Sequence, residues 1–182
     1  GCGTLNAITP KALRAIRDLG ATHVWYTGVI RHATSQHNTP SIVKGKAGSP
    51  YAITDYYDID PDICEDKRRR MHEFEELVER SHQAKLDVII DFVPNHVARE
   101  CHSTCKPKGV EDLGATDNPQ WAFSPLNNFY YIHQPFAPSF DVEGYTENPT
   151  RATGNDCFTA HPSKDDWYET VKLNYGVDYG DG

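Results

Sequence analysis

Residues 86–96 read LDVIIDFVPNH, an apolar run that contains two aspartates and ends in a polar cluster. Residues 22–30 read THVWYTGVI and form a second run that is rich in β-branched and aromatic side chains. Both patterns predict strands that are buried on both faces, as in a parallel sheet. An apolar stripe over residues 67–85 predicts a helix between them. The three segments together predict a right-handed βαβ unit.

The segments outside this unit differ from one another in pattern. Thr9 followed by Pro10 predicts the start of a helix that ends at Gly20. A loop of about 35 residues is expected after the first strand, and loops of that length are usually functional or mobile. After Asn95 the chain is rich in proline and aromatic residues, and we expect only short strands there, at 128–133 and 157–159.

Composition places the chain among folded globular proteins. It has 182 residues, of which 38% are hydrophobic and 24% charged, and a net charge of -8. Residues 97–182 carry 13 acidic and 6 basic side chains, so we expect no nucleic-acid partner. The basic run 67–70 fits a solvated helix face better than a nucleic-acid patch. A membrane span needs about 20 apolar residues in a row, and the sequence has no such run.

The cysteines do not indicate a disulfide framework, because they are odd in number and irregularly spaced. They are Cys2, Cys64, Cys101, Cys105 and Cys157. One alternative function is a zinc-binding module, with ligands drawn from Cys101, Cys105, His96 and His102. Zinc sites usually contain two close pairs of ligands, and Cys101 and Cys105 form one pair at an unusual spacing. No leader sequence is visible, so the localisation is left open.

Polar side chains that follow a buried strand mark the first place to look for a site. Parallel α/β sheets bind their ligands beyond the carboxyl ends of the strands, where Asp91, Asn95 and His96 are expected. Asp91 interrupts an apolar run and needs a basic residue, a metal or several N–H donors opposite it. In the structural alternative, Asp91 caps a turn and His96 is a buried histidine whose hydrogen bonds are satisfied.

Three segments resemble the α-amylase family of glycoside hydrolases, family 13. Residues 91–96 (DFVPNH) resemble the family's first signature at the end of the third barrel strand. Residues 19–27 resemble the second strand, and residues 51–61 resemble the loop that follows it. The resemblance implies an α/β fold, a partial (β/α)8 TIM barrel around strands 2 and 3 with an irregular, β-rich insertion. It places the barrel in residues 1–96 and the inserted domain B in residues 97–182.

The resemblance also assigns roles to single residues. Tyr51 matches the aromatic residue on which a sugar stacks, and His96 matches the histidine that hydrogen-bonds the same sugar. Asp91 matches a buried carboxylate that orients the centre from beneath. Asn95 matches an amide that binds calcium in many members, with further ligands open among Asp112, Asp117, Asp141 and Asp156. One departure is Ala52, because the family usually has an aspartate after the tyrosine.

The resemblance places the bond-cleaving carboxylates after the fourth, fifth and seventh strands. No segment after Val97 resembles those strands, so we expect no catalytic residue in this chain and no activity from it alone. The resemblance implies that the parent protein is a retaining glycosidase that acts on an α-glucan or maltooligosaccharide. Its oligomeric state is left open. The alternative is a non-catalytic carbohydrate-binding module. Five aromatic residues are candidate sugar platforms or, as we expect for most of them, core: Trp121, Tyr130, Tyr131, Phe136 and Trp167.

Overall fold

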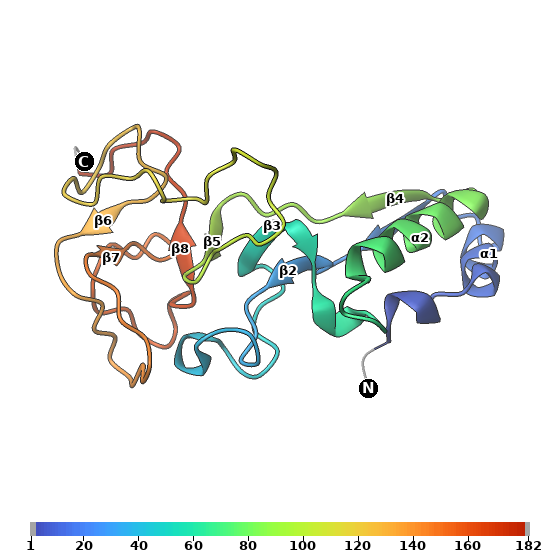
Figure 1. The fold of residues 1–182 in the computed structure, drawn as a ribbon, viewed down its shortest axis with the longest axis horizontal. Coiled ribbons are helices and arrows are strands. Elements are labelled where there is room, and N and C mark those ends of the chain that lie inside the picture. Colours follow the sequence, from blue (N-terminus) through green and yellow to red (C-terminus); the bar gives the residue numbers. More distant parts are fainter. Residues whose placement is uncertain (1–2, 181–182) are drawn as a thin grey trace. The chain divides into compact units, whose positions relative to one another are not determined.

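A computed structural model describes residues 3–180, which divide into two compact units (Figure 1). Unit 1 comprises the chain up to residue 31 together with residues 56–92. Unit 2 comprises residues 32–55 and the chain from residue 93 onward. The strands β2 (Ile30–His32) and β3 (Ile53–Ile59) pair with each other, and the boundary between the units runs through both.

Unit 1 is built from helices and a parallel pair of strands. Its other elements are η1 (Leu5–Ala7), α1 (Pro10–Asp18), β1 (His23–Tyr26), η3 (Pro61–Ile63), α2 (Arg70–Gln83) and β4 (Asp87–Ile90). The predicted start of α1 is confirmed, since Thr9 Oγ1 accepts a hydrogen bond from Ala12 N at 3.3 Å. Gly20 follows α1 with a φ of 95°, a conformation that glycine adopts without strain.

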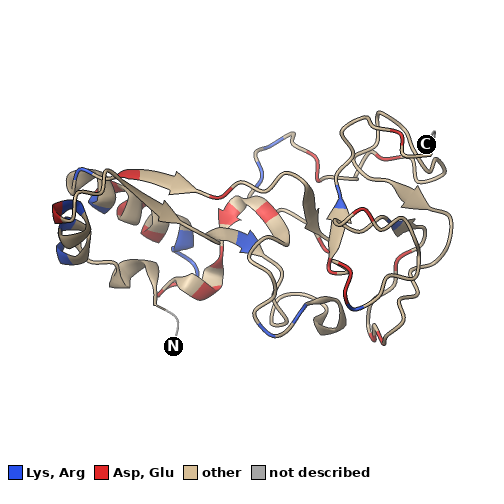
Figure 2. Cartoon of the chain, turned by 180° about the vertical axis from the view of Figure 1, so that it is seen from behind, with Lys and Arg blue, Asp and Glu red and all other residues tan. Residues whose placement is uncertain are grey.

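The helix α2 begins at Arg70, three residues later than expected, because a turn precedes it. The Glu73 carboxylate accepts hydrogen bonds from the backbone N–H groups of Glu65 and Asp66, at 2.9 and 2.7 Å. Asp66 in turn accepts from Arg68 N at 2.9 Å. The helix packs against β4, α1 and η1. Both helices carry basic and acidic residues (Figure 2), and Glu73 is the buried exception among those of α2.

The strands β1 and β4 pair in parallel, with His23 opposite Asp87 and Tyr26 opposite Ile90, which confirms the predicted pair. The prediction that both strands are buried on both faces is wrong. Trp25 is 63% exposed and Ile89 46%, because β1 and β4 form a sheet of two strands within residues 3–180. One core cluster beside them contains Leu13, Ala84 and Leu86.

The expected long loop contains a strand, β3, so that prediction is wrong in part. The residues ITDYYDI at 53–59 are mostly β-branched or aromatic, which is a strand pattern. Asp58 on β3 accepts hydrogen bonds from Arg31 at 3.0 Å and from Arg70 at 2.6 and 2.7 Å. Burial raises the pKa of Asp58, but these two guanidinium groups outweigh it and hold the pKa below its usual value.

Unit 2 is irregular and contains short antiparallel pairs. Its elements are η2 (Pro40–Ile42), β5 (His96–Ala98), β6 (Tyr131–Ile132), β7 (Thr150–Arg151) and β8 (Thr170–Lys172). The strand β5 pairs with β8, and β6 with β7. The strand expected at 128–133 is therefore confirmed for two residues. The strand expected at 157–159 is wrong, because a turn ends there: Thr153 N donates to Cys157 O, and Asp156 has a φ of 63°.

The lengths of the helices can be compared with the expectation that no segment of the sequence spans a membrane. The longer of the two α-helices in residues 3–180, α2, has 14 residues. Within that part of the chain, no helix combines the length and the apolar character that a bilayer crossing requires.

Candidate functional site

Two pockets of unit 2 share three side chains, Tyr51, His96 and Trp167. One pocket has a volume of about 340 Å³ and is completed by Lys44, Gly48, Ser49, Glu169 and Thr170. The other has a volume of about 460 Å³ and is completed by Val93, Asn95, Gly154, Asn155 and Asp156. Because they share a wall of aromatic side chains, we treat them together as the site pocket.

The strand β5 sets the position of His96. His96 is the first residue of the strand and lies opposite Lys172 on β8. Its ring meets the Trp167 ring edge to face, with centroids 5.3 Å apart and an angle of 62°. Gly154 packs tightly behind it, because a Cβ there would lie 2.8 Å from His96 Cβ. This position therefore requires glycine for steric reasons.

The His96 ring is buried and hydrogen-bonded. His96 is 7% exposed, and this burial lowers the pKa of its imidazole below the ordinary value. The hydrogen bond to the backbone of Tyr51 raises the pKa, whereas the charge of Lys172 lowers it. The Asn95 side-chain amide nitrogen lies 3.0 Å from His96 Nδ1 and donates to it. The neutral imidazole is thus the form that this site favours.

Tyr51 stands at the rim of the site pocket. Its backbone N–H donates to Ser49 Oγ at 3.3 Å, which closes a turn before β3. The residue is 40% exposed, and Trp167 is 46% exposed. Two half-exposed aromatic side chains beside a fixed imidazole form a surface suited to a flat, partly apolar ligand with hydroxyl groups.

Asn95 offers a poor set of neighbours for calcium. Its amide nitrogen also donates to Gly154 O at 2.8 Å, and the nearby Asp156 carboxylate is paired with Lys172 Nζ. Asp117 accepts hydrogen bonds from Asn128 N, Phe129 N and Tyr131 OH. Asp112 pairs with His102 and Lys106. Calcium takes about six to eight oxygen ligands. Among residues 3–180, no three His, Cys, Asp or Glu side chains gather around Asn95 at ligand distance, and no step below depends on calcium.

Asp91 belongs to unit 1, whereas Tyr51, Asn95 and His96 belong to unit 2. Its Oδ1 accepts a hydrogen bond from Trp25 Nε1 at 2.8 Å, and its Oδ2 accepts from Gly28 N at 3.3 Å. Of the partners that the sequence left open for this carboxylate, the structure therefore shows N–H donors.

The residues of the zinc alternative have other partners. Cys101 Sγ donates to Thr54 O at 3.5 Å, His102 pairs with Asp112, and His96 packs on Trp167. Burial raises the pKa of the Cys101 thiol to about 12, which opposes the thiolate that zinc requires. Within residues 3–180, no three side chains of this set gather at ligand distance. Cys64, Cys101 and Cys157 are free thiols, and Cys2 lies outside the described residues.

Sequence reasoning assigned Trp167 no specific role in the site pocket. It was one of five aromatic candidates, and it alone among them lines the site pocket. Tyr130, Tyr131 and Phe136 are 3%, 9% and 8% exposed, which confirms that most of the five build a core. Trp121 is 62% exposed and lies outside that core. Trp167 is found only through the β5–β8 pairing, which joins distant parts of the chain.

Comparisons with known proteins identify the family. The model described as "Alpha amylase, catalytic domain" matches residues 1–169. Maltase 1 of Drosophila virilis is 31% identical over 121 residues, which are 66% of this chain and 16% of that protein. Maltase A1 of Drosophila melanogaster is 30% identical over 100 residues, which are 55% of this chain and 14% of that protein. The chain thus spans about a sixth or less of these relatives.

Among solved structures, an α-amylase from Lactobacillus plantarum aligns with a TM-score of 0.54 and 24% identity. The alignment covers 96% of this chain and 29% of that one. At this identity the likeness concerns the fold, which in this family is a (β/α)8 barrel. Within residues 3–180, the parallel strands of the structure are the pair β1–β4.

Proposed function

The chain belongs to the family of α-amylase catalytic domains, and we propose that it supplies part of the sugar-binding site of a glycosidase. The substrate is an α-glucan or maltooligosaccharide, and the bond cleaved is α-glucosidic. The names of the two Drosophila relatives, both maltases, support this class of substrate. We also propose that residues 1–96 belong to the barrel and residues 97–182 to an inserted domain.

The observation that carries the proposal is the convergence of Tyr51, His96 and Trp167 on one pocket. A pyranose presents an apolar C–H face that packs on an aromatic ring, while its hydroxyl groups seek polar partners at the edge. Tyr51 provides the ring in this proposal, and His96 provides the polar contact. The Asn95 amide and the Tyr51 backbone hold the imidazole in place for that contact.

The proposed reaction is hydrolysis or transfer through a covalent glycosyl-enzyme intermediate. Such a retaining mechanism requires two carboxyl groups about 5 Å apart, one as nucleophile and one as acid and base. We place neither group in this chain, since no segment after Val97 resembles the strands that bear them in the family. Asp91 is proposed to orient the centre, with its two N–H partners fixing the carboxylate.

Titration calorimetry with maltose tests the proposed site. We expect Tyr51→Ala to raise the Kd about tenfold or more, because burying an aromatic ring against a ligand contributes about 1.5–3 kcal/mol. Trp121→Ala is the matched control, since Trp121 is exposed but lies outside the site pocket. Equal affinities in Tyr51→Ala and the unmodified chain would exclude Tyr51 as the sugar platform.

The activity of the chain alone is a separate prediction. We expect the purified 182-residue chain to release no reducing sugar from starch or maltooligosaccharides. Release that Tyr51→Ala abolishes would show that the chain holds the catalytic carboxylates. Sugar binding without turnover in the whole protein would instead identify a non-catalytic carbohydrate-binding module.

A further inference from the structure

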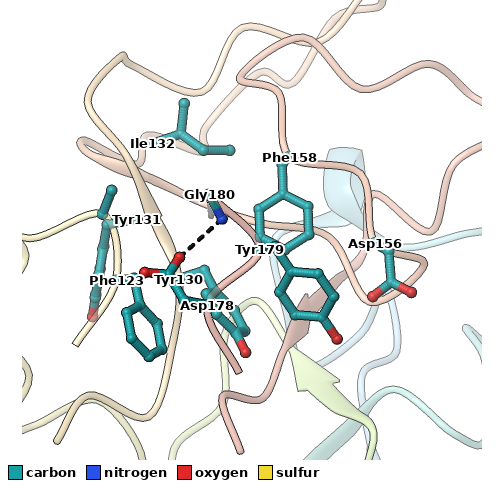
Figure 3. A pocket seen from close by; sticks show the side chains of 10 residues that line it. Phe123, Tyr130, Tyr131, Ile132, Asp156, Phe158, Asp178, Tyr179 and Gly180 are labelled. Atoms are coloured by element: carbon teal, nitrogen blue, oxygen red, sulfur yellow. Dashed lines mark hydrogen bonds between the residues drawn. The ribbon is translucent and has the colours of Figure 1, made fainter. Parts of the chain in front are cut away.

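Unit 2 has another pocket, of about 510 Å³, whose wall consists mostly of aromatic side chains (Figure 3). We call it the aromatic pocket. Its lining residues are Ala122, Phe123, Tyr130, Tyr131, Ile132, Asp156, Phe158, Asp178, Tyr179 and Gly180. None of the roles assigned above to Tyr51, His96 or Trp167 uses this pocket.

Tyr130 forms the fixed base of the aromatic pocket. It is 3% exposed, and its hydroxyl donates to Val177 O at 2.9 Å. The Phe123 ring stacks on it at 6.1 Å between centroids, and the rings of Phe158 and Tyr179 meet it edge to face at 5.3 and 5.6 Å. A buried ring with a satisfied hydroxyl thus holds the surrounding rings in defined orientations.

The outer rings remain open to a ligand. Phe158 is 40% exposed and Tyr179 is 49% exposed, although both pack against a buried core. Exposed aromatic surface that is gathered in a concave site typically marks a binding site. Figure 3 shows the two rings side by side at one wall, with the Asp156 carboxylate next to them.

The charges at the rim favour a neutral ligand. Aromatic rings beside carboxylates also attract cations, but here Lys172 already occupies that position. Its Nζ pairs with Asp156 and lies 5.5 Å from the centroid of the Tyr179 ring. Asp178 accepts a hydrogen bond from Gly180 N at 2.9 Å, drawn as a dashed line in Figure 3. Carboxylate oxygens beside flat rings suit the hydroxyl groups and C–H faces of a sugar.

Asp156 connects the aromatic pocket with the site pocket, because it lines both. We propose that the aromatic pocket is a second α-glucan site, continuous with the site pocket, so that one long oligosaccharide contacts both. This inference rests on the proposed function and adds to it a preference for longer substrates. A disaccharide bound in the site pocket makes no contact with the aromatic pocket, whereas a longer oligosaccharide also contacts the aromatic rings there.

Binding of two ligands, maltose and maltoheptaose, tests the inference by titration calorimetry on the protein. We expect Phe158→Ala to raise the Kd of maltoheptaose about tenfold, the scale of one lost aromatic contact, and to leave that of maltose unchanged. Tyr179→Ala should act in the same direction, and so should Asp178→Asn, which removes no packing volume. Trp121→Ala, outside both pockets, is the control and should change neither Kd. Circular dichroism melting checks that each variant is folded.

Two outcomes would overturn the inference. One is an unchanged Kd of maltoheptaose in folded Phe158→Ala, Tyr179→Ala and Asp178→Asn. The other is binding of tetramethylammonium that Phe158→Ala abolishes but that does not compete with maltoheptaose, which would identify a cation site that the oligosaccharide does not occupy. Failure of the proposed function has a different signature: Tyr51→Ala would leave the Kd of maltose unchanged while Phe158→Ala still weakens maltoheptaose.

Discussion

His96 illustrates how much one residue of the site pocket depends on its neighbours. Three contacts fix the ring: the Asn95 amide, the Tyr51 backbone and the Trp167 ring. Gly154 provides the space behind it, since a larger residue would displace the imidazole. The residue therefore links the backbone of the Tyr51 turn to β5, and its charge state affects both the fold and the site.

The buried imidazole predicts a pH dependence of stability. Burial lowers the pKa of His96 below the ordinary value of 6.5, so the unfolded chain binds this proton more readily than the folded one. The contribution of His96 is fully present above pH 6.5 and is lost as the pH falls from there through the lowered pKa. Urea unfolding between pH 7.5 and pH 5 measures this contribution. We expect His96→Gln to reduce the dependence of the unfolding free energy on pH.

The control for this prediction is His133→Gln, because His133 is exposed in unit 2. The unfolding free energy of His133→Gln should depend on pH in the same way as that of the unmodified chain. If His96→Gln and the unmodified chain lose stability in parallel as the pH falls, the titrating group is not His96.

At the scale of elements, a buried ion cluster joins β5 to β7. Arg99 directly follows β5, and its Nη1 lies 2.8 Å from Glu147 Oε1. Arg151 on β7 lies 2.7 Å from Glu147 Oε2 and also donates to Arg99 O at 2.9 Å. The Glu147 side chain is 7% exposed and that of Arg99 0%. Tyr145 donates its hydroxyl to the same carboxylate, so Glu147 serves two guanidinium groups and one phenol.

Removing the charge of Glu147 should destabilise the chain strongly. Glu147→Gln leaves one buried and one partly buried guanidinium group without a counter-charge, and breaking a buried pair costs about 3–5 kcal/mol of unfolding free energy. Burial raises the pKa of Glu147, but the charges of Arg99 and Arg151 outweigh it and keep the pKa below its ordinary value. The carboxylate is therefore ionised at neutral pH. Chemical denaturation measures the loss.

The comparison variant is Glu143→Gln, because Glu143 is exposed and four residues earlier in the same segment. Its unfolding free energy should stay within about 0.5 kcal/mol of the unmodified value. A loss of similar size in both variants would mean that the ion cluster does not hold β5 and β7 together.

The elements also show which parts of the fold a sequence can predict. The helix α1 and the pair β1–β4 were predicted because their signals are local: a Thr-Pro start, a glycine end and two apolar runs. The strands β5 and β8 have three residues each and pair across distant parts of the chain, so no local pattern marks them. The same distance explains the site: a family resemblance indicated Tyr51 and His96, while Trp167 needed the structure.

At the scale of the whole molecule, exposed apolar side chains gather on the sheet of unit 1. Successive side chains of a strand point to opposite faces, and Ile89 and Ile90 on β4 are 46% and 40% exposed. Trp25, paired with Ile89 across the strands, is 63% exposed. Both faces of this two-stranded sheet therefore present apolar surface. A surface of this kind normally lies against other protein, and exposed it promotes association.

The 182-residue chain should therefore bind the dye 1-anilinonaphthalene-8-sulfonate and self-associate as its concentration rises. We expect the double variant Ile89→Thr and Ile90→Thr to reduce both effects, because threonine keeps the β propensity and removes apolar area. Dye fluorescence and light scattering measure the change. Leu126→Thr is the control, since Leu126 is 87% exposed in unit 2 and should contribute little to a sheet surface. If Leu126→Thr reduced dye binding and self-association equally, the sheet of unit 1 would not be the surface that causes them.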